Sequence, residues 1–327
     1  MRQGRGRIVP LVLMFGSVCW GKMPIIFDTD MGNDVDDALA LAMLHTLSDR
    51  GECRLIGVTL TNANPAAVPF IRLVNRFYGR AALPVGAAVR SLEGGAMDKY
   101  LSAVLKTAPA SYGDNGSLKA GAEPSVNLLR RLLAESTEKV VIVQVGFSTN
   151  LAALLESSAD AISPKSGMEL VREKVALLSA MAGDFSGGKP EYNVKLDAAA
   201  AQIVFERWPS PVVLSGFEIG RELFYPAESI EIDFAYADWH PVAASYRAYG
   251  KMPYNRPTWD LTAVLEAVRG SRGYFGKSVP GQVRVDKDGA TRFEPGDGDR
   301  SYLLLDPAQR SRVIEALTLL ASEPPVR

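Results

Sequence analysis

The stretch from Pro24 to Leu44 constrains the fold of this chain more than any other part of it. Its first residues, Ile25 to Phe27, form an apolar run that is long enough for a buried strand. From Ala38 onward an Ala- and Leu-rich pattern predicts a helix. Between and within the two segments lie five aspartates: Asp28, Asp30, Asp34, Asp36 and Asp37. The first turn of the expected helix therefore carries two adjacent carboxylates.

This density of carboxylates directly after a strand predicts a cation site. A carboxylate at a helix N-terminus gains only about 0.3–1 kcal/mol from the helix dipole. Several carboxylates packed together repel one another unless a cation neutralises them or some take up protons. Hard divalent cations prefer oxygen ligands, so Ca²⁺ or Mg²⁺ is the natural partner. The alternative is a solvated acidic loop in front of a well-capped helix.

Strand-like and helix-like segments alternate along the rest of the chain. Strands are expected at residues 54–61, 83–86, 139–145, 174–181 and 211–214. Helices are expected at residues 65–78, 125–134, 150–155, 196–207, 241–249, 259–268 and 307–321. Residues 91–122 show no clear period and are expected to form a long surface excursion, and Asp288-Gly289 predicts a hairpin over residues 282–293.

This alternation predicts an α/β fold with a mostly parallel central sheet flanked by helices, an open Rossmann-like sheet. The C-terminal third is expected to add helices and a hairpin, and no linker divides residues 23–327 into two domains. In such sheets ligands bind at the carboxyl ends of the strands. Polar or turn residues fall at four predicted strand ends: Asp28 and Asp30, Asn62 and Asn64, Val145 and Gly146, and Gly183 and Asp184. Their convergence indicates one shared site.

An ordered set of motifs resembles the inosine-uridine preferring nucleoside hydrolases. Asp28-Thr29-Asp30 followed by Asp36-Asp37-Ala38 is similar to the aspartate signature of that family, and Asn64 to its substrate asparagine. The turn over residues 145–150 resembles the family's Gly-x-x-Thr-Asn turn. Glu191-Tyr192-Asn193 resembles its Glu-Phe-Asn ribose clamp, and Trp259-Asp260 falls where a late metal-binding aspartate is expected.

The resemblance implies a Ca²⁺-dependent hydrolase that cleaves the N-glycosidic bond of ribonucleosides, and a homo-oligomer. It implies a metal site built from the carboxylates of Asp30, Asp37 and Asp260 and the carbonyl of Val145. Asp30 would also accept the proton of the metal-bound water, which makes it the implied catalytic residue. The implied ribose contacts are Asp36, Asn64, Glu191 and Asn193. A pocket dense in carboxylates suits this reaction because the sugar becomes oxocarbenium-like and positively charged.

Three features depart from the family pattern. The spacing from Asp30 to Asp36 is two residues longer than in well-known members, so Asp34 could compete with its neighbours for a role. The family's histidine before the late aspartate is replaced by Trp259, whose indole could stack on a purine and favour protonation of the base; the alternative is a core residue at a helix start. The loop over residues 183–190 lacks the family's asparagine for the 5′-hydroxyl, and Asp184 could substitute for it.

The remaining polar residues leave other interpretations open. His45 is expected to pack within the first helix, whereas His240 lies in a C-terminal lid region and could either pack or touch substrate.

A nucleoside- or ribose-binding protein of the same fold that has lost turnover is the alternative function. A dehalogenase-type phosphatase is disfavoured because Gly32 stands where that class needs Thr or Val. Asn33 occupies the glycine position of an EF-hand loop and excludes that reading.

The N-terminus and the overall charge bear on location and partners. Three arginines precede the apolar run from Ile8 to Trp20, which is the layout of a signal peptide over residues 1–22. We therefore expect a periplasmic or secreted protein, or a cytoplasmic one if Met23 is the true start. A net charge of −1 gives no footprint for nucleic acid or an anionic membrane. The expected partner is a small-molecule nucleoside, with neither nucleic acid nor membrane.

Overall fold

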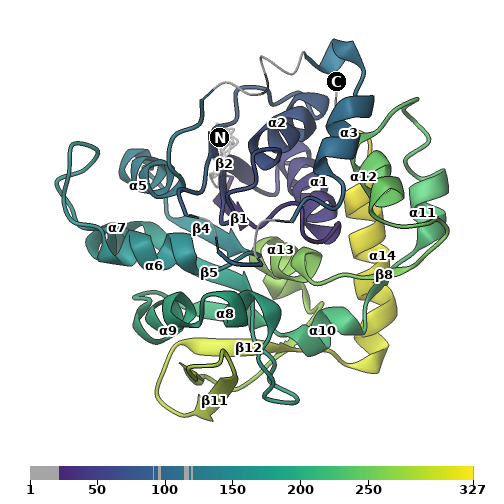
Figure 1. Cartoon of the computed structure of the whole chain (residues 1–327). Helices are drawn as coiled ribbons and strands as arrows, with labels where there is room; N and C mark the ends of the chain where they lie inside the picture. Colours follow the sequence, from purple (N-terminus) through teal and green to yellow (C-terminus); the bar gives the residue numbers. More distant parts are fainter. Residues whose placement is uncertain (1–21, 91, 95–96, 114–117, 119–120, 327) are drawn as a thin grey trace, which may run out of the picture.

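The computed structural model describes residues 22–90, 92–94, 97–113, 118 and 121–326 of the chain. Of the signal peptide predicted over residues 1–22, only Lys22 falls among them. Figure 1 shows a central sheet with helices packed against it on both sides. The mostly parallel, helix-flanked sheet that the sequence predicts is therefore confirmed.

The sheet has the strand order β11-β10-β12-β6-β5-β4-β1-β2-β3, and β9 pairs with β12 beside this path. Parallel pairs run without a break from β12 to β3. The parallel strands are β1 (Pro24–Thr29), β2 (Arg54–Leu60), β3 (Val85–Gly86), β4 (Val140–Gln144), β5 (Val175–Met181), β6 (Val212–Ser215) and β12 (Arg300–Leu304). Because they are parallel, their carboxyl ends lie at one edge of the sheet.

Alternating side chains of the central strand enter two hydrophobic cores. In β1, Ile25 and Phe27 pack into one core and Ile26 into the other, as the two-residue period of a strand requires. The first core contains α1 (Asp36–Asp49), α2 (Ala67–Phe77), α12 (Pro241–Tyr249), α13 (Asp260–Arg269) and α14 (Pro307–Ser322). The second contains α5 (Ser125–Glu135), α6 (Thr149–Glu156), α7 (Gly167–Lys174) and α9 (Ala198–Arg207). The central strands are buried on both faces, which explains their continuous apolar runs.

The structure differs from the sequence prediction within residues 91–122. A helix, α3 (Leu101–Thr107), and a 3₁₀ turn (Ala110–Tyr112) form there, where a surface excursion without periodicity is predicted. Tyr100, Leu101 and Val104 are buried and make the helix part of the first core. Their spacing of three and four residues is a helical pattern that is too short to stand out from the polar residues around it.

The C-terminal hairpin belongs to the main sheet. Its strands β10 (Gly281–Val285) and β11 (Thr291–Pro295) pair antiparallel, and β10 joins the sheet through β12. A short strand pair, β7 (Phe224–Tyr225) and β8 (Arg256–Pro257), lies outside this sheet. The remaining elements are α8 (Tyr192–Leu196), α10 (Phe217–Arg221), α11 (Ala227–Ile232), a 3₁₀ turn (Gly270–Arg272) and β9 (Gly276–Lys277).

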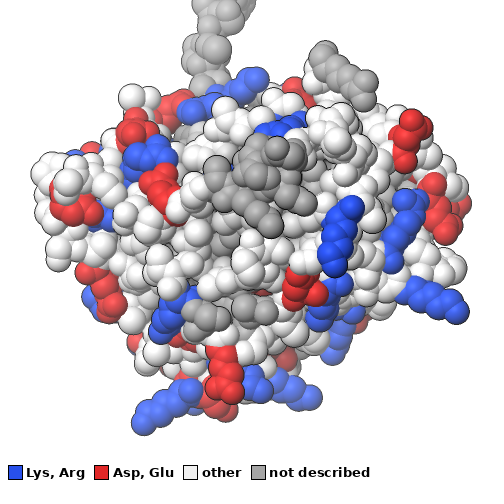
Figure 2. Space-filling model, turned by 45° about the horizontal axis from the view of Figure 1, so that its top comes forward, with Lys and Arg blue, Asp and Glu red and all other residues white. Residues whose placement is uncertain are grey.

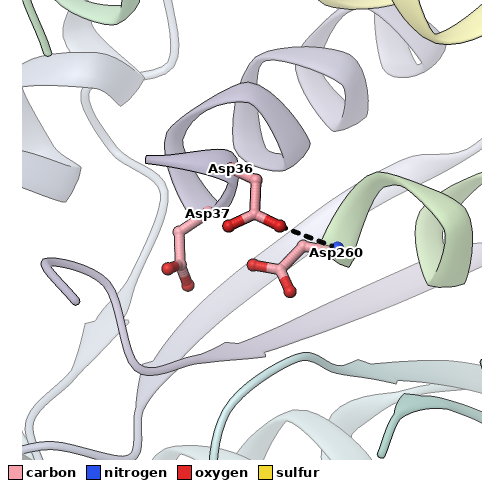
Figure 3. Close-up of side chains that lie close together, drawn as sticks. All are labelled: Asp36, Asp37 and Asp260. Atoms are coloured by element: carbon pink, nitrogen blue, oxygen red, sulfur yellow. Dashed lines mark hydrogen bonds between the residues drawn. The ribbon is translucent and has the colours of Figure 1, made fainter. Parts of the chain in front are cut away.

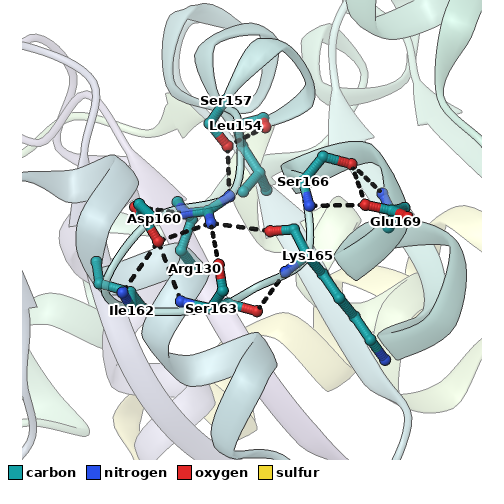
Figure 4. Close-up of polar contacts among 9 residues, drawn as sticks. All are labelled: Arg130, Leu154, Ser157, Asp160, Ile162, Ser163, Lys165, Ser166 and Glu169. Carbon is teal, nitrogen blue, oxygen red and sulfur yellow. Dashed lines mark hydrogen bonds and ion pairs between the residues drawn. The ribbon is translucent and has the colours of Figure 1, made fainter.

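A buried arginine fixes the loop between α6 and α7 (Figure 4). Arg130 extends from α5, and only 1% of its surface is exposed. Its guanidinium pairs with both carboxylate oxygens of Asp160, at 3.0 and 2.8 Å, and donates to Ser157 Oγ at 2.7 Å. It also donates to the carbonyls of Ser163 and Lys165. The contacts of one side chain therefore fix the conformation of this loop, whose described residues contain no helix or strand between α6 and α7.

No helix in the described part of the chain combines the length and apolar character that a membrane span requires. On the face that Figure 2 shows, basic and acidic side chains are interspersed among uncharged ones. This distribution agrees with the near-zero net charge of the sequence.

Candidate active site

A cavity of about 270 Å³ lies at the carboxyl edge of the parallel sheet. Asp30 follows β1, Val145 follows β4 and Met181 ends β5, so three neighbouring strands each deliver a lining residue. Eight of the nine predicted site residues line it: Asp30, Asp36, Asp37, Val145, Glu191, Asn193, Trp259 and Asp260. The other lining residues are Asn33, Asp34, Met97, Lys99, Tyr192, Phe217, Arg256 and Met181.

Three buried carboxylates from two helices meet in this cavity. Asp36 and Asp37 lie in the first turn of α1, and Asp260 lies in the first turn of α13. Figure 3 shows the three side chains pointing toward one another. One oxygen from each lies within 4.8 Å of the others. Asp37 also accepts a hydrogen bond from the hydroxyl of Thr29 at the end of β1, which anchors the cluster to the sheet.

Burial and mutual repulsion raise the pKa of the three clustered carboxyl groups and of Asp30, which lines the same cavity. Desolvation, followed by the charge of Asp36, raises the pKa of Asp30 to about 8. Desolvation, followed by the charge of Asp34, raises the pKa of Asp36 to about 7. The pKa values of Asp37 and Asp260 are raised well above 3.8 by the same two effects. Such a set of buried oxygen ligands fits a hard divalent cation, whose charge would offset the repulsion.

The carbonyl of Val145 completes the oxygen donors at this end of the cavity. It accepts a hydrogen bond from Asn193 Nδ2 at 2.9 Å, which leaves its second lone pair free. Asn193 also donates to the carbonyl of Met181 at 3.2 Å, so it links the ends of β4 and β5. Asn193 therefore holds the Val145 carbonyl in place besides facing the cavity itself.

Asp36 and Glu191 each use carboxylate oxygens to cap a helix. Asp36 Oδ2 accepts from the backbone amides of Trp259 at 2.8 Å and Asp260 at 3.2 Å. These amides belong to the start of α13, where backbone donors lack partners within the helix. Glu191 caps α8 by accepting from the amides of Asn193 and Val194, and burial raises its pKa to about 7. Each carboxylate is thus held in one orientation at the cavity wall.

Asn64 and Asp184 lie outside the lining of the cavity. The amide group of Asn64 donates to the carbonyl of Met97 at 3.0 Å and accepts from the backbone amide of Ala66 at 2.8 Å. It therefore supports Met97, which does line the cavity. Asp184 Oδ1 accepts from the backbone amides of Ser186 at 3.0 Å and of the following glycine at 2.8 Å, so it shapes its own loop.

Both histidines of the chain are buried away from the cavity. His45 donates a hydrogen bond from Nε2 to Asn75 Oδ1 at 2.9 Å and stacks on the ring of Tyr78. His240 caps α12 through Nδ1, and its Nε2 lies 3.3 Å from the hydroxyl of Tyr78. The packing predicted for His45 agrees with this position, and His240 takes the packing alternative rather than the substrate contact.

Three residues that line the cavity were not predicted from the sequence: the aromatic Phe217 and the basic Arg256 and Lys99. Phe217, at the start of α10, stacks on Trp259 with 5.6 Å between ring centroids and 20° between planes. Trp259 Nε1 donates to the carbonyl of Phe217 at 2.9 Å, so the indole N–H already has a partner. Arg256 and Lys99 line the same cavity. None of the three belongs to a motif, and only the folded chain brings them to the site.

The longer spacing between Asp30 and Asp36 has a structural role. Gly32 has φ +117°, and a Cβ there would lie 2.8 Å from the carbonyl of Met97. Only glycine tolerates this conformation and this contact. Asp34, which the extra residues supply, forms an ion pair with Arg256 and is not part of the three-carboxylate cluster.

Comparison with known proteins agrees with the geometry of the site. The family model described as inosine-uridine preferring nucleoside hydrolase matches residues 25–315. The pyrimidine-specific ribonucleoside hydrolase RihA of Citrobacter koseri is 30% identical over 225 residues. That match covers 64% of either protein, so it spans just under two thirds of the curated relative.

Solved structures show the same fold. An inosine-uridine preferring nucleoside hydrolase from Bacillus anthracis has a TM-score of 0.70 at 18% identity, over 92% of this chain and 99% of that one. A purine-preferring ribonucleoside hydrolase from Gardnerella vaginalis has a TM-score of 0.69 at 19% identity, over 91% of this chain and 99% of that one. Taken with the family match, the chain belongs to the inosine-uridine preferring nucleoside hydrolase family.

Proposed function

We propose that this protein hydrolyses the N-glycosidic bond of ribonucleosides, releasing ribose and a free base, in a Ca²⁺-dependent reaction. The observation that carries the proposal is the cluster of Asp36, Asp37 and Asp260 inside a cavity of about 270 Å³. That volume lies just below the usual range of about 300–1,000 Å³ for ligand pockets, which suits a small ligand such as a nucleoside. The family match and the ribonucleoside hydrolase activity for which the RihA relative is named support it.

The oxygen donors of the site suit calcium. Asp37 and Asp260 of the cluster would hold the ion, together with Asp30 and the carbonyl of Val145, which line the same cavity outside the three-carboxylate cluster. Ca²⁺ takes about 6–8 oxygen ligands. If each of these groups gives one oxygen atom, the shell is incomplete, and ribose hydroxyls and water have room to complete it. When bound, the ion lowers the pKa of a water molecule and orients it. Substrate recognition and water activation would then depend on the same group of aspartates.

The protein's own residues divide the remaining work. Asp30 would accept the proton of the attacking water once the bound ion has displaced its own proton, because burial and the charge of Asp36 raise its pKa to about 8 and leave the metal-free carboxyl largely protonated at neutral pH. The surrounding carboxylates oppose the positive charge that develops on the sugar. Asp36, Glu191 and Asn193 face the cavity and would orient the ribose hydroxyls. Asn64 would contribute less directly, since Met97 and Ala66 already engage its amide.

The aromatic pair of Trp259 and Phe217 is the proposed platform for the base. Their rings stack on one another and both line the cavity. Nucleobases stack on aromatic side chains with about 1–3 kcal/mol per base. The indole N–H is bonded to the carbonyl of Phe217, so Trp259 would act through its ring face and not as a hydrogen-bond donor.

The test is hydrolysis of a nucleoside panel by the purified protein, following free ribose and free base separately. Release of both products in equal amounts from at least one ribonucleoside is the expected result. A second candidate function is nucleoside binding without turnover, which is favoured by one observation: neither histidine of the chain lines the cavity. Calorimetric binding of nucleosides without any product release would favour that candidate and overturn hydrolysis.

We also propose export through the N-terminal segment and assembly as a homo-oligomer. The arginines followed by the apolar run before Met23 support export. Mass spectrometry of the mature N-terminus after expression in a bacterial host tests it, with an intact Met1 as the contradicting result. Light scattering of the purified protein tests the oligomer, and a monomer at micromolar concentration would contradict it.

A further inference from the structure

Arg256 reaches the candidate active site from a distant part of the chain and is held there by Asp34. It lies in β8, and its Nε donates to Asp34 Oδ1 at 3.1 Å while its Nη2 pairs with the other carboxylate oxygen. The pair joins residues 222 positions apart, and both line the cavity. A two-bond pairing between a guanidinium and a carboxylate fixes the orientation as well as the position of the arginine.

Aromatic rings fix the same guanidinium from two further directions. Its central carbon lies 5.3 Å from the ring centroid of Tyr249 and 5.6 Å from that of Trp259. Lys99, the second cation in the lining, lies 5.4 Å from the Tyr249 ring. Within the described part of the chain, Nη1 of Arg256 donates no hydrogen bond. Nη1 is therefore the guanidinium nitrogen left to bind a ligand in the cavity that Arg256 lines, next to the Trp259 ring that we assign to the base.

The reaction creates a need for such a donor. When the C–N bond breaks, its electron pair stays on the base nitrogen, and the base becomes anionic unless it is protonated. Neither histidine lines the cavity, and the indole N–H of Trp259 is already engaged. A fixed positive charge beside the base opposes protonation of the base but stabilises a departing anion. The charge of an arginine does not depend on pH in the physiological range.

We propose that Arg256 contacts the leaving base and donates a hydrogen bond to one of its carbonyl oxygens, which makes it both a leaving-group and a specificity residue. This inference rests on the proposed hydrolase function. The base departs with the bond electrons, stabilised by Arg256, and then takes a proton from solvent. Water adds to the anomeric carbon and gives its proton to Asp30, so the net reaction consumes one water molecule.

The chemistry of the donor selects among bases. Hypoxanthine presents a carbonyl oxygen where adenine presents an amino group, and the two purines otherwise have nearly the same shape. A guanidinium donates and cannot accept, so it matches the carbonyl and opposes the amino group. The wild-type protein is therefore expected to hydrolyse inosine with a higher kcat/KM than adenosine.

The experiment compares Arg256→Met with the wild type on inosine, adenosine and p-nitrophenyl β-D-ribofuranoside. The nitrophenolate is a stable anion that departs without help, so the aryl riboside reports sugar binding and water attack alone. Loss of one preorganised donor lowers rates by about 10²–10³, and we expect this loss for inosine with no change for the aryl riboside. The preference for inosine over adenosine is expected to shrink at the same time.

Arg54→Met is the matched control, because Arg54 forms a surface pair with Glu138 at the amino-terminal end of β2. It should leave the rates on all three substrates unchanged. Arg256→Lys, which keeps the charge but not the planar fork, should fall between wild type and Arg256→Met, and it replaces the methionine variant if that one fails to fold.

The outcomes separate the inference from the function on which it rests. Equal losses on inosine and the aryl riboside would show that Arg256 only braces the loop through Asp34, and would overturn the inference. A wild-type preference for adenosine would also overturn it. A wild-type protein that hydrolyses neither nucleosides nor the aryl riboside would instead overturn the proposed function, and the inference with it.

Discussion

The carboxylate of Asp36 accepts a hydrogen bond from the backbone amide of Trp259 at 2.8 Å, across 223 positions of sequence. This bond joins the first turn of α1 to the start of α13. It therefore brings Asp37 and Asp260, the neighbours of these two residues, into one cluster beside the Trp259 ring. A single capping contact thus connects the proposed metal site with the proposed base platform.

Asp30→Asn is expected to lower nucleoside hydrolysis by about 10²–10⁴, the usual contribution of a general base. The amide cannot accept the proton of the attacking water, yet it nearly preserves the shape of the carboxylate. Initial rates of ribose release at saturating Ca²⁺ measure the effect. Asp297→Asn, a change at an exposed position of the C-terminal hairpin region, should leave the rate unchanged. Retention of the wild-type rate by Asp30→Asn would refute the assigned role.

Trp259→Ala is expected to reduce kcat/KM more for purine than for pyrimidine nucleosides, because the larger purine overlaps more of the aromatic platform. Base–aromatic stacking of about 1–3 kcal/mol sets the scale of the loss. Trp259→Phe should recover most of it, since a ring remains against Phe217. Parallel assays with inosine and uridine provide the comparison, and losses of the same size on both would argue against stacking.

Calcium should stabilise the protein more as the pH rises. The folded pKa values of Asp30 and Asp36, about 8 and about 7, exceed the ordinary value of 3.8. The unfolded chain therefore releases protons that the folded, metal-free protein retains, and the free energy of unfolding falls as the pH rises from about 4 to about 8. Ca²⁺ must displace those protons, so its affinity increases over the same interval.

Thermal unfolding with and without CaCl₂ at about pH 5 and about pH 8 measures this coupling. The increase in Tm on adding Ca²⁺ should be larger at the higher pH. The same increase at both pH values would mean that the raised pKa values do not belong to the groups that bind the ion.

Arg130→Met should destabilise the fold without altering the active site. The buried guanidinium supports the loop between α6 and α7 through Asp160 and two backbone carbonyls. The carboxylate that loses its partner is 40% exposed, so the main cost is the loss of the donor to the two carbonyls, about 1–3 kcal/mol for an unsatisfied buried group. Arg131→Met, one position along the same helix and partly exposed, should lower the free energy of unfolding by less than about 1 kcal/mol. Urea denaturation of both variants gives the comparison; similar values would show that the network contributes little.

The sequence predicts those parts of the fold whose signal is local. β1 and β4 contain apolar runs buried on both faces, β5 is buried from Leu178 onward, and α12 and α14 begin at Pro241 and Pro307. Asp36 and Asp37 are predictable because they stand in the first turn of a helix that directly follows a strand. By contrast, α3 is missed because it depends on three apolar residues that become buried only against other helices.

The rest of the site depends on contacts that no local pattern encodes. Arg256 lies in a short strand without a motif, and its position follows from its pairing with Asp34 across 222 positions. Phe217 reaches the cavity because Trp259 bonds its carbonyl. Asn64 follows a strand end as expected, yet its amide turns to the carbonyl of Met97. Long-range packing therefore decides which residues at the carboxyl edge face the ligand.

The most direct test of the account is hydrolysis by protein that has been stripped with a chelator and then titrated with Ca²⁺. The best substrate of the nucleoside panel is used, and free ribose is followed for the wild type and for Asp260→Ala. We predict that chelation stops ribose release, that Ca²⁺ restores it in the wild type, and that Asp260→Ala stays inactive at every Ca²⁺ concentration that restores the wild type. Full activity in the chelated protein, or in Asp260→Ala, would contradict a reaction that depends on a metal ion held by this cluster.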